Sequence, residues 1–182
     1  MLATSIVIAP SIEVRSIAMS SVDSLYQLVN VNRAHFERYL PAMVVALGSP
    51  EGAHEHVRLG VERYEQDESF EFHVFAECDL CGVVRLNKYD RDRQHISIAY
   101  CIAASFQKRG IVTNACAAVL RHAFGHLDIH RVELRCATDN VGSIRVAERL
   151  GFAREGRLRQ VARLGGSLVD EYVYGLLRSE VR

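Results

Sequence analysis

The stretch Gln107-Lys108-Arg109-Gly110-Ile111-Val112-Thr113 decides how the rest of this 182-residue chain is interpreted. It follows residues 94–102, whose pattern predicts a strand, and it opens an amphipathic helix that starts near Ile111. A glycine turn before a helix leaves several backbone N–H groups unpaired at the positive end of the helix dipole. With the charges of Lys108 and Arg109 beside them, these groups predict a site for the pyrophosphate of a coenzyme.

This stretch alone does not separate a ligand site from an ordinary glycine turn. It lacks the G-x-G-x-x-G pattern of dinucleotide-binding folds and the G-x-x-x-x-G-K-S/T pattern of P-loops. A second stretch, TDNVGSIRVAERLGF at residues 138–152, favours the ligand site because the two stretches occur together in one chain.

Together the two stretches resemble the GNAT superfamily of acyl-CoA-dependent N-acetyltransferases. Gln107 and Gly110 match the family's pyrophosphate loop, Q/R-x-x-G-x-G/A. The resemblance implies an α/β GNAT fold, in which a mixed, mostly antiparallel central sheet has splayed strands and flanking helices. The second stretch resembles the family pattern N-x-x-S-x-x-V/A-x-x-x-G-F at Asn140, Ser143, Ala147, Gly151 and Phe152.

Three further segments narrow the resemblance to the branch that acetylates the N-termini of ribosomal proteins at serine or alanine. The resemblance extends from about residue 12 to residue 177. It implies transfer of an acetyl group from acetyl-CoA to an amine, which we expect to be a protein N-terminus, and it implies a homodimer. The three segments are Asn32-Arg33 with Tyr39-Leu40-Pro41, the strand at residues 98–102, and Val169-Asp170-Glu171-Tyr172.

The resemblance assigns roles to individual residues. Coenzyme contacts are implied for Cys101 and Ile102, for residues 107–113, and for Asn140 and Ser143. A backbone N–H near Cys101 or Ile102 would polarise the thioester carbonyl, and the Ser143 hydroxyl would donate a proton to the departing thiolate. The alternative for Asn140 and Ser143 is a cap of the next helix. The acceptor pocket, for which an ordinary helix surface is the alternative, is implied at Asn32, Arg33, His35 and Tyr39.

The general base is where this sequence departs from the family. Many GNAT enzymes carry Glu on the strand before the loop, where this chain has Ser97, and ribosomal-type enzymes can carry Glu at the place of Ala162. Neither side chain accepts a proton. Glu155 and His95 are nearby in sequence, but no physical argument from the sequence places either at the site. About a tenth of an α-amine is neutral at pH 7, against about one part in a few thousand of a lysine amine. An enzyme without an obvious base therefore suits α-amines better than lysine amines.

The order of predicted elements indicates one domain. Residues 1–11 are expected to form a tail or a short strand, and residues 12–182 a single acetyltransferase domain. One helix should continue towards Phe36, and a hairpin should turn at Asp79. The last two strands should join across Gly165-Gly166. The order β-α-α-β-β-β-α-β-α-β-β predicts a mixed α/β fold.

Composition limits the class of protein. Hydrophobic residues make up 49% of the chain, which is typical of a globular protein. The longest apolar run is too short to span a membrane, and the N-terminus lacks the basic region and clean apolar core of a signal peptide. We therefore expect a cytoplasmic protein without membrane contact. The formal net charge is zero, which argues against general binding of nucleic acid.

Charged residues, cysteines and histidines are unevenly spread. Residues 51–79 are acidic and could attract a cationic amine, while residues 131–163 are rich in Arg and could serve the coenzyme phosphates, although solvated helix faces explain both. The five cysteines favour reduced thiols. We expect no metal at the C-x-x-C pair or at the evenly spaced histidines. These residues are Cys78 and Cys81, and His122, His126 and His130.

Two alternatives to a protein-acetylating enzyme remain open. The acceptor could be a small amine such as a polyamine or an antibiotic. The chain could also be a non-catalytic acyl-CoA-binding regulatory module, which the absence of a carboxylate at Ser97 and Ala162 would suit.

Overall fold

The computed structural model describes residues 5–181. Runs of strands and runs of helices follow one another along the chain, as in a mixed α/β fold. The strands are β1 (Ser5–Ala9), β2 (Ile12–Ser16), β3 (Phe70–Ala76), β4 (Asp79–Asp90), β5 (His95–Ile102), β6 (Arg131–Ala137), β7 (Ala153–Leu164) and β8 (Ser167–Leu177). The helices are α1 (Val22–Val31), α2 (Arg33–Glu37), α3 (Pro41–Ala46), α4 (Pro50–Glu65), α5 (Ile111–His126) and α6 (Val141–Arg149), with short 3₁₀ turns η1 (Ile17–Met19), η2 (Ala104–Phe106) and η3 (Arg178–Glu180).

The strands form one eight-stranded sheet in the order β1-β2-β3-β4-β5-β6-β8-β7. Every neighbouring pair is antiparallel except β5 and β6, which are parallel. Their pairing ends at Ile98 and Leu134, although β5 continues to Ile102 and β6 to Ala137. The two strands therefore splay apart and leave an opening in the middle of the sheet, so the expected mostly antiparallel sheet with splayed strands is confirmed.

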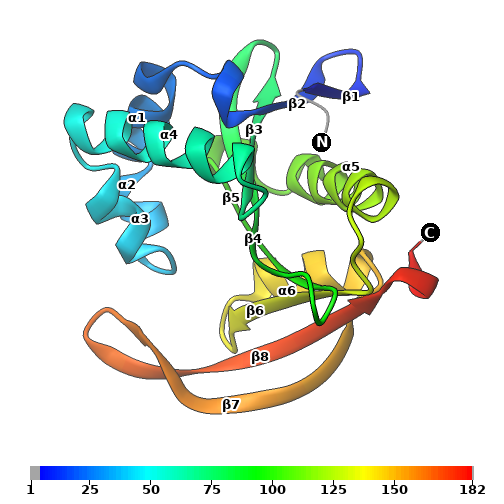
Figure 1. The fold of residues 1–182 in the computed structure, drawn as a ribbon. Helices are drawn as coiled ribbons and strands as arrows, with labels where there is room; N and C mark the ends of the chain where they lie inside the picture. Colours follow the sequence, from blue (N-terminus) through cyan, green and yellow to red (C-terminus); the bar gives the residue numbers. More distant parts are fainter. Residues whose placement is uncertain (1–4, 182) are drawn as a thin grey trace.

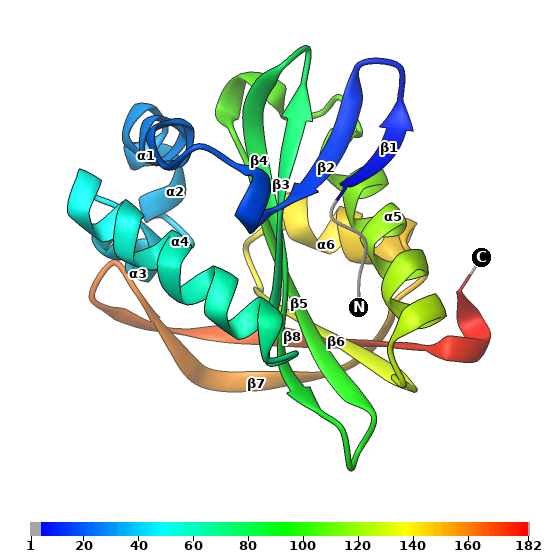
Figure 2. The ribbon, with the colours of Figure 1, turned by 45° about the horizontal axis from the view of Figure 1, so that its top comes forward.

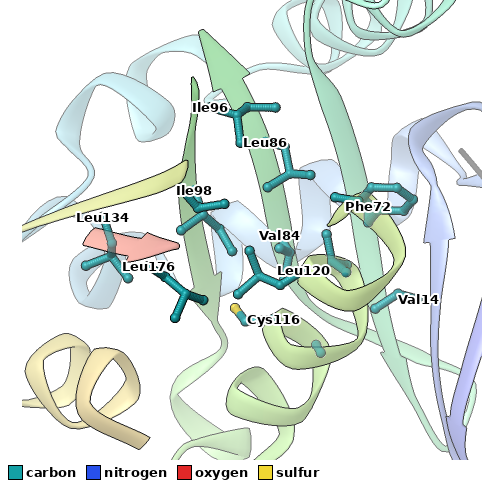
Figure 3. Packing of buried hydrophobic residues seen from close by; sticks show 14 of the residues in the cluster. Val14, Phe72, Val84, Leu86, Ile96, Ile98, Cys116, Leu120, Leu134 and Leu176 are labelled. Atoms are coloured by element: carbon teal, nitrogen blue, oxygen red, sulfur yellow. The ribbon is translucent and has the colours of Figure 1, made fainter. Parts of the chain in front are cut away.

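Two layers of helices cover the two faces of the sheet (Figure 1). On the face that we call the α5 face, α5 packs on apolar side chains such as Leu86, Ile98 and Leu134, which Figure 3 shows beside Cys116 and Leu120. On the opposite face, called the α4 face, α1 to α4 enclose a second, smaller core. This core contains Leu25, Leu28, Val29, Phe36, Val44, Leu47, Ala53, Val83, Cys101 and Ala103.

The last two strands form a long hairpin whose tip lies beside α3 in both views of the ribbon (Figures 1 and 2). It turns at Gly165 and Gly166, as predicted, with φ of 54° and 83°. Left-handed conformations of this kind favour glycine because it has no Cβ. The tip of the hairpin therefore lies on the same side of the molecule as α2 and α3.

Local structure differs from the sequence prediction at three places. The first predicted helix does not continue to Phe36 but breaks at Asn32, whose Nδ2 donates to the Leu28 carbonyl at 2.9 Å. An amide side chain that competes for backbone groups in this way favours a helix end. Pro41 begins α3, a helix that the predicted order of elements lacks, because Pro suits the first position of a helix. The β3–β4 hairpin turns at residues 77 and 78 rather than at Asp79.

Candidate functional site

The stretch at residues 107–113 forms the turn between β5 and α5. Lys108 and Gly110 adopt left-handed backbone conformations, with φ of 60° and 75°. Gly110 is the N-cap of α5, and in the described structure no side chain caps this helix end and no acidic residue lies in its first turn. The first N–H groups of α5 are therefore available to an anion. Arg109 packs over the Phe106 ring and lies 3.7 Å from Glu77.

The splayed end of β5 supplies a second set of backbone groups. One edge of residues 99–102 is paired with β4, while the described strands place no partner on the other edge beyond Ile98. Unpaired backbone groups at a sheet edge can bind an extended chain. Cys101 and Ile102 lie at this edge, next to the turn at residues 107–113, so the structure brings together the two parts of the predicted coenzyme site.

Tyr100 and Ser143 meet across the opening on the α5 face. The Tyr100 hydroxyl lies 2.7 Å from Ser143 Oγ. Burial raises the pKa of the Tyr100 hydroxyl, which stays protonated and can donate to Ser143. Asn140 Oδ1 accepts a hydrogen bond from the Ser143 backbone N–H at 3.1 Å. Asn140 is therefore the N-cap of α6, as its alternative role proposed, whereas the alternative role of Ser143 as a cap is wrong.

Tyr100 is the residue at this site that the sequence interpretation missed. It lies on the predicted strand, but its partner is 43 positions later in the chain. A strand pattern predicts which face a side chain takes, not which hydroxyl it meets. The one available signal was that a tyrosine on the core face needs a partner for its hydroxyl.

Two residues predicted for the acceptor pocket bind the segment between β5 and α5. Asn32 Oδ1 accepts a hydrogen bond from the Ala104 N–H at 3.0 Å. His35 Nε2 lies 3.1 Å from Gln107 Nε2. The junction of α1 and α2 is therefore attached to the segment that leads from β5 into α5.

The other two predicted acceptor residues, Arg33 and Tyr39, contact other parts of the chain. The Tyr39 hydroxyl donates to the Asp139 carbonyl at 3.3 Å, and Arg38 Nη2 lies 3.2 Å from Asp139 Oδ2. These contacts connect α2 to the loop between β6 and α6. Arg33 instead reaches the Gly48 carbonyl at 3.5 Å, between α3 and α4. Residues 32–39 thus span the opening from the β5 side to the β6 side.

A buried ionic network lies on the α4 face of β3 and β4. Glu71 is 4% exposed, and its carboxylate accepts hydrogen bonds from His56 Nε2 at 3.0 Å, His73 Nε2 at 2.9 Å and Arg85 Nε at 2.6 Å. Burial acts to raise the pKa of Glu71, but these three partners hold that pKa well below its usual range. Glu71 is therefore a fully engaged carboxylate.

Two adjoining hollows follow the same face of the sheet. The larger, of about 630 Å³, lies between α4 and the β3–β4 strands, and the smaller has about 160 Å³. Asn87 and Lys88 line both, which makes them parts of one polar groove. The smaller hollow reaches Ser97 and Ala99 at the edge of the opening.

The two places where relatives carry Glu have different surroundings. Ser97 lies on the α4 face of β5, opposite Glu133 of β6. Ala162 lies far out on β7, opposite Val169 of β8. Both positions lie on the α4 face. Ala162 does so because its partner Val169 shares a face of β8 with Glu171, and Glu171 lies opposite Ala137 of β6.

The two other groups considered as a base are held away from the opening. Glu155 binds Arg131 through both carboxylate oxygens, and Arg131 holds the pKa of Glu155 below its usual range. His95 lies 3.8 Å from Glu133. Arg131 and His95 begin β6 and β5, so both groups belong to the paired end of these strands rather than to the splayed end.

The remaining patterns in the sequence have structural explanations. Several acidic residues of segment 51–79 are paired with arginines, including Glu55, Asp67 and Glu77. Cys81 is buried and its thiol donates to the Val74 carbonyl, while Cys78 is exposed. The part of the chain that the structure describes contains no cluster able to hold a metal ion, and none of its helices has the length and apolarity needed to span a membrane.

Comparison with known proteins agrees with this geometry. The sequence profile of the acetyltransferase (GNAT) domain matches residues 12–153. The chain is 30% identical over 173 residues to the Probable N-acetyltransferase YjcK of Bacillus subtilis, covering 93% of this chain and 96% of that protein. It is 29% identical over 169 residues to the ribosomal-protein-serine acetyltransferase of Escherichia coli, with coverage of 92% and 93%. The solved structure of RimL, a ribosomal L7/L12 α-N-protein acetyltransferase in complex with coenzyme A, superposes with a TM-score of 0.89 at 26% identity, covering 95% of this chain and 97% of that one.

Proposed function

The chain belongs to the GNAT acetyltransferase family, and we propose that it transfers acetyl from acetyl-CoA to the N-terminal α-amine of a protein such as a ribosomal protein. The observation that carries this proposal is the opening between β5 and β6, with a free helix N-terminus on one side and a polar groove on the other. The similarity to a ribosomal-protein-serine acetyltransferase over most of both chains supports a protein acceptor. As an N-acetyltransferase, the protein is not a merely regulatory acyl-CoA-binding module.

The residues around the opening fit the coenzyme. The N–H groups at residues 111–113 and the side chains of Lys108 and Arg109 would hold the pyrophosphate, because they present donors and positive charge together. The free edge of residues 99–102 would hold the pantetheine arm by backbone hydrogen bonds, with Cys101 and Ile102 nearest the thioester. Asn140 already caps α6, so its contribution would be to hold Ser143 in place.

The same residues supply the steps of acyl transfer. Acetyl-CoA, when bound, supplies an activated thioester carbonyl. A backbone N–H at Cys101 or Ile102 would stabilise the negative charge that develops on the carbonyl oxygen. The Ser143 hydroxyl would give its proton to the departing sulfur, and the protonated Tyr100, 2.7 Å away, would hold that hydroxyl in position.

The acceptor would approach from the α4 face, beneath residues 32–39. The groove past Ala99 and Ser97 could receive the chain that follows the N-terminal residue. Asn32 and His35 would act by fixing the segment between β5 and α5, and Tyr39 by fixing the β6–α6 loop, while Arg33 would line the entrance from α3. An α-amine is preferred over lysine because more of it is neutral at pH 7.

A multiple-turnover assay of thiol release tests the proposed acceptor. The acceptors are N-terminal peptides of ribosomal proteins with a free α-amine, the same peptides Nα-acetylated but carrying one lysine, and a polyamine. We expect turnover with the free α-amine and at least tenfold less with the other two. Faster reaction of the blocked lysine peptide or of the polyamine would contradict a protein N-terminus as the acceptor.

Cellular location and assembly follow from the same proposal. An enzyme that modifies ribosomal proteins would work in the cytoplasm, where they are made. We propose a homodimer, supported by the exposed apolar side chains of Val161 and Leu168 on the long β7–β8 hairpin. Sedimentation of the purified protein measures its mass, and a monomer at micromolar concentration would contradict the dimer.

A further inference from the structure

Four carboxylates lie on β6, on β8 or in the loop between β6 and α6. They are Glu133, Asp139, Asp170 and Glu171. Three of the four are paired. Glu133 accepts from Arg135 Nε at 2.7 Å, and Asp139 lies 3.2 Å from Arg38. Asp170 accepts from Arg157 Nε at 2.6 Å and from the Gln160 N–H at 2.8 Å, which lower its pKa.

Glu171 differs from the other three. Within residues 5–181, no ion pair or side-chain hydrogen bond engages its half-buried carboxylate. It lies on β8 opposite Ala137, the last residue of β6 and three positions beyond the end of the β5–β6 pairing. Its neighbours Tyr172 and Tyr174 belong to the α5 face with Cys136 and Leu134, so alternation places Glu171 on the α4 face.

The surroundings of Cys136 relate Glu171 to Ser143. Burial raises the pKa of the Cys136 thiol, a hydrogen bond with Ser143 lowers it, and the charge of Glu171 raises it. Cys136 precedes Ala137, which lies opposite Glu171, so Ser143 and Glu171 flank this end of β6 from the two faces of the sheet. Ser143 lies on the side expected for the coenzyme sulfur, and Glu171 on the side from which the acceptor would come.

Neighbouring cations do not neutralise Glu171. On β6, Arg135 shares the α4 face but binds Glu133. On β7, the residue opposite Glu171 is the apolar Leu158. In the turn after α2, Arg38 is engaged by Asp139. The groove reaches Arg135, which lies opposite Val173, two positions before the end of the β6–β8 pairing at Glu171. A carboxylate without a cation near such a groove is suited to a cationic ligand.

We propose that Glu171 receives the α-ammonium of the acceptor and takes one proton from it, an assignment that rests on the proposed function. The nitrogen lone pair then forms the bond to the acetyl carbonyl carbon, and the carbon–sulfur bond breaks. The nitrogen loses its second proton to water, and Glu171 then releases its own proton to water. The sulfur gains a proton from Ser143, whose hydroxyl is replenished from water. One proton is released in total. Glu171 thus takes the place of the carboxylates missing at Ser97 and Ala162.

Comparison of the wild-type protein with Glu171→Gln tests this assignment by its dependence on pH. At pH 7 only about a tenth of an α-amine is neutral, so we expect kcat/KM of the variant to fall about tenfold or more. At pH 9 the amine is neutral without help, and the difference should shrink to less than threefold. Glu148→Gln, which removes an exposed carboxylate from α6, is the matched control and should behave as wild type.

Calorimetry supplies a second readout that does not depend on turnover. We expect Glu171→Gln, loaded with coenzyme A, to bind a free-amine peptide at pH 6.5 at least fivefold more weakly than wild type, with unchanged affinity for the Nα-acetylated peptide. Equal binding and equal kcat/KM of the two proteins at pH 7 would overturn the role of Glu171 while leaving the acetyltransferase intact. A wild-type protein that releases no thiol with any amine would overturn both proposals.

Discussion

The two sides of the β5–β6 opening present different chemical groups, backbone groups on one side and side chains on the other. On the side proposed to bind the coenzyme, called the coenzyme side, the main elements are backbone N–H groups from one contiguous turn at residues 107–113 and one strand edge at residues 99–102. On the α4 face, the corresponding elements are side chains from separate helices and strands, such as Tyr39, Glu71, Arg85 and Glu171. The first side depends on local conformation, and the second depends on how distant segments pack together.

This difference explains which substitutions each side should tolerate. A backbone donor survives replacement of its side chain as long as the local conformation is kept. A side chain that accepts several buried hydrogen bonds leaves its partners unsatisfied when it is removed. Substitutions on the α4 face should therefore affect stability and acceptor chemistry, and those on the coenzyme side should act only when they change charge or conformation.

The largest effect on stability is expected for Glu71→Gln on the α4 face. Removing one partner of a buried charge network typically costs about 3 kcal/mol, because Arg85 loses its counter-charge. Urea unfolding at pH 7 measures the loss. Glu55→Gln, which breaks an exposed pair with Arg58, is the control and should leave the midpoint unchanged.

The pH dependence of the same network has a defined sign. The pKa of Glu71 is lower in the folded protein than the value of about 4.3 expected in the unfolded chain. Its contribution to stability is therefore fully present above that value and is lost as the pH falls through the folded pKa. The difference in unfolding free energy between wild type and Glu71→Gln should shrink below about pH 4. A difference that stays constant down to pH 3 would contradict a charged Glu71.

A smaller effect, confined to catalysis, is expected at the boundary between the two sides. Ser143→Ala removes the hydroxyl beside Tyr100 but keeps the backbone N–H that Asn140 caps. We expect kcat to fall about 100-fold, within the usual range for loss of a general acid. The affinity for acetyl-CoA, measured by calorimetry, should stay within twofold of wild type. A kcat equal to that of wild type would show that the thiolate leaves without help from Ser143.

The smallest effect is expected where the helices of the α4 face contact the segment between β5 and α5. Asn32→Ala removes the acceptor for the Ala104 N–H and should weaken acetyl-CoA binding about fivefold, because one hydrogen bond contributes about 1 kcal/mol. Asn30→Ala is the matched control, since Asn30 reaches only Tyr26 on the surface of α1. Equal affinities in the two variants would show that the segment between β5 and α5 keeps its conformation without Asn32.

The same difference separates what the sequence predicted from what it did not. The turn at Gly110 and the cap residue Asn140 lie within short stretches, so their conformation follows from nearby residues. The Tyr100–Ser143 contact and the position of Glu171 depend on strand register and on the order β5-β6-β8, which no local pattern contains. The break at Asn32 was missed because the helical pattern continued through it while a side-chain hydrogen bond ended the helix.

The turn at Gly110 also gives the most direct test of the coenzyme site. Asp and Asn both tolerate the left-handed conformation and both cap helices well, so Gly110→Asp and Gly110→Asn should fold alike. Only Asp places a negative charge beside the expected pyrophosphate, where like charges about 4 Å apart repel by up to roughly 4 kcal/mol.

We would therefore titrate acetyl-CoA into the wild-type protein and these two variants by calorimetry. We expect micromolar binding to wild type, affinity within tenfold of that for Gly110→Asn, and binding about 100-fold weaker for Gly110→Asp, which corresponds to about 2.7 kcal/mol. Equal affinities for the Asp and Asn variants, or no binding to wild type, would contradict a coenzyme site at the N-terminus of α5.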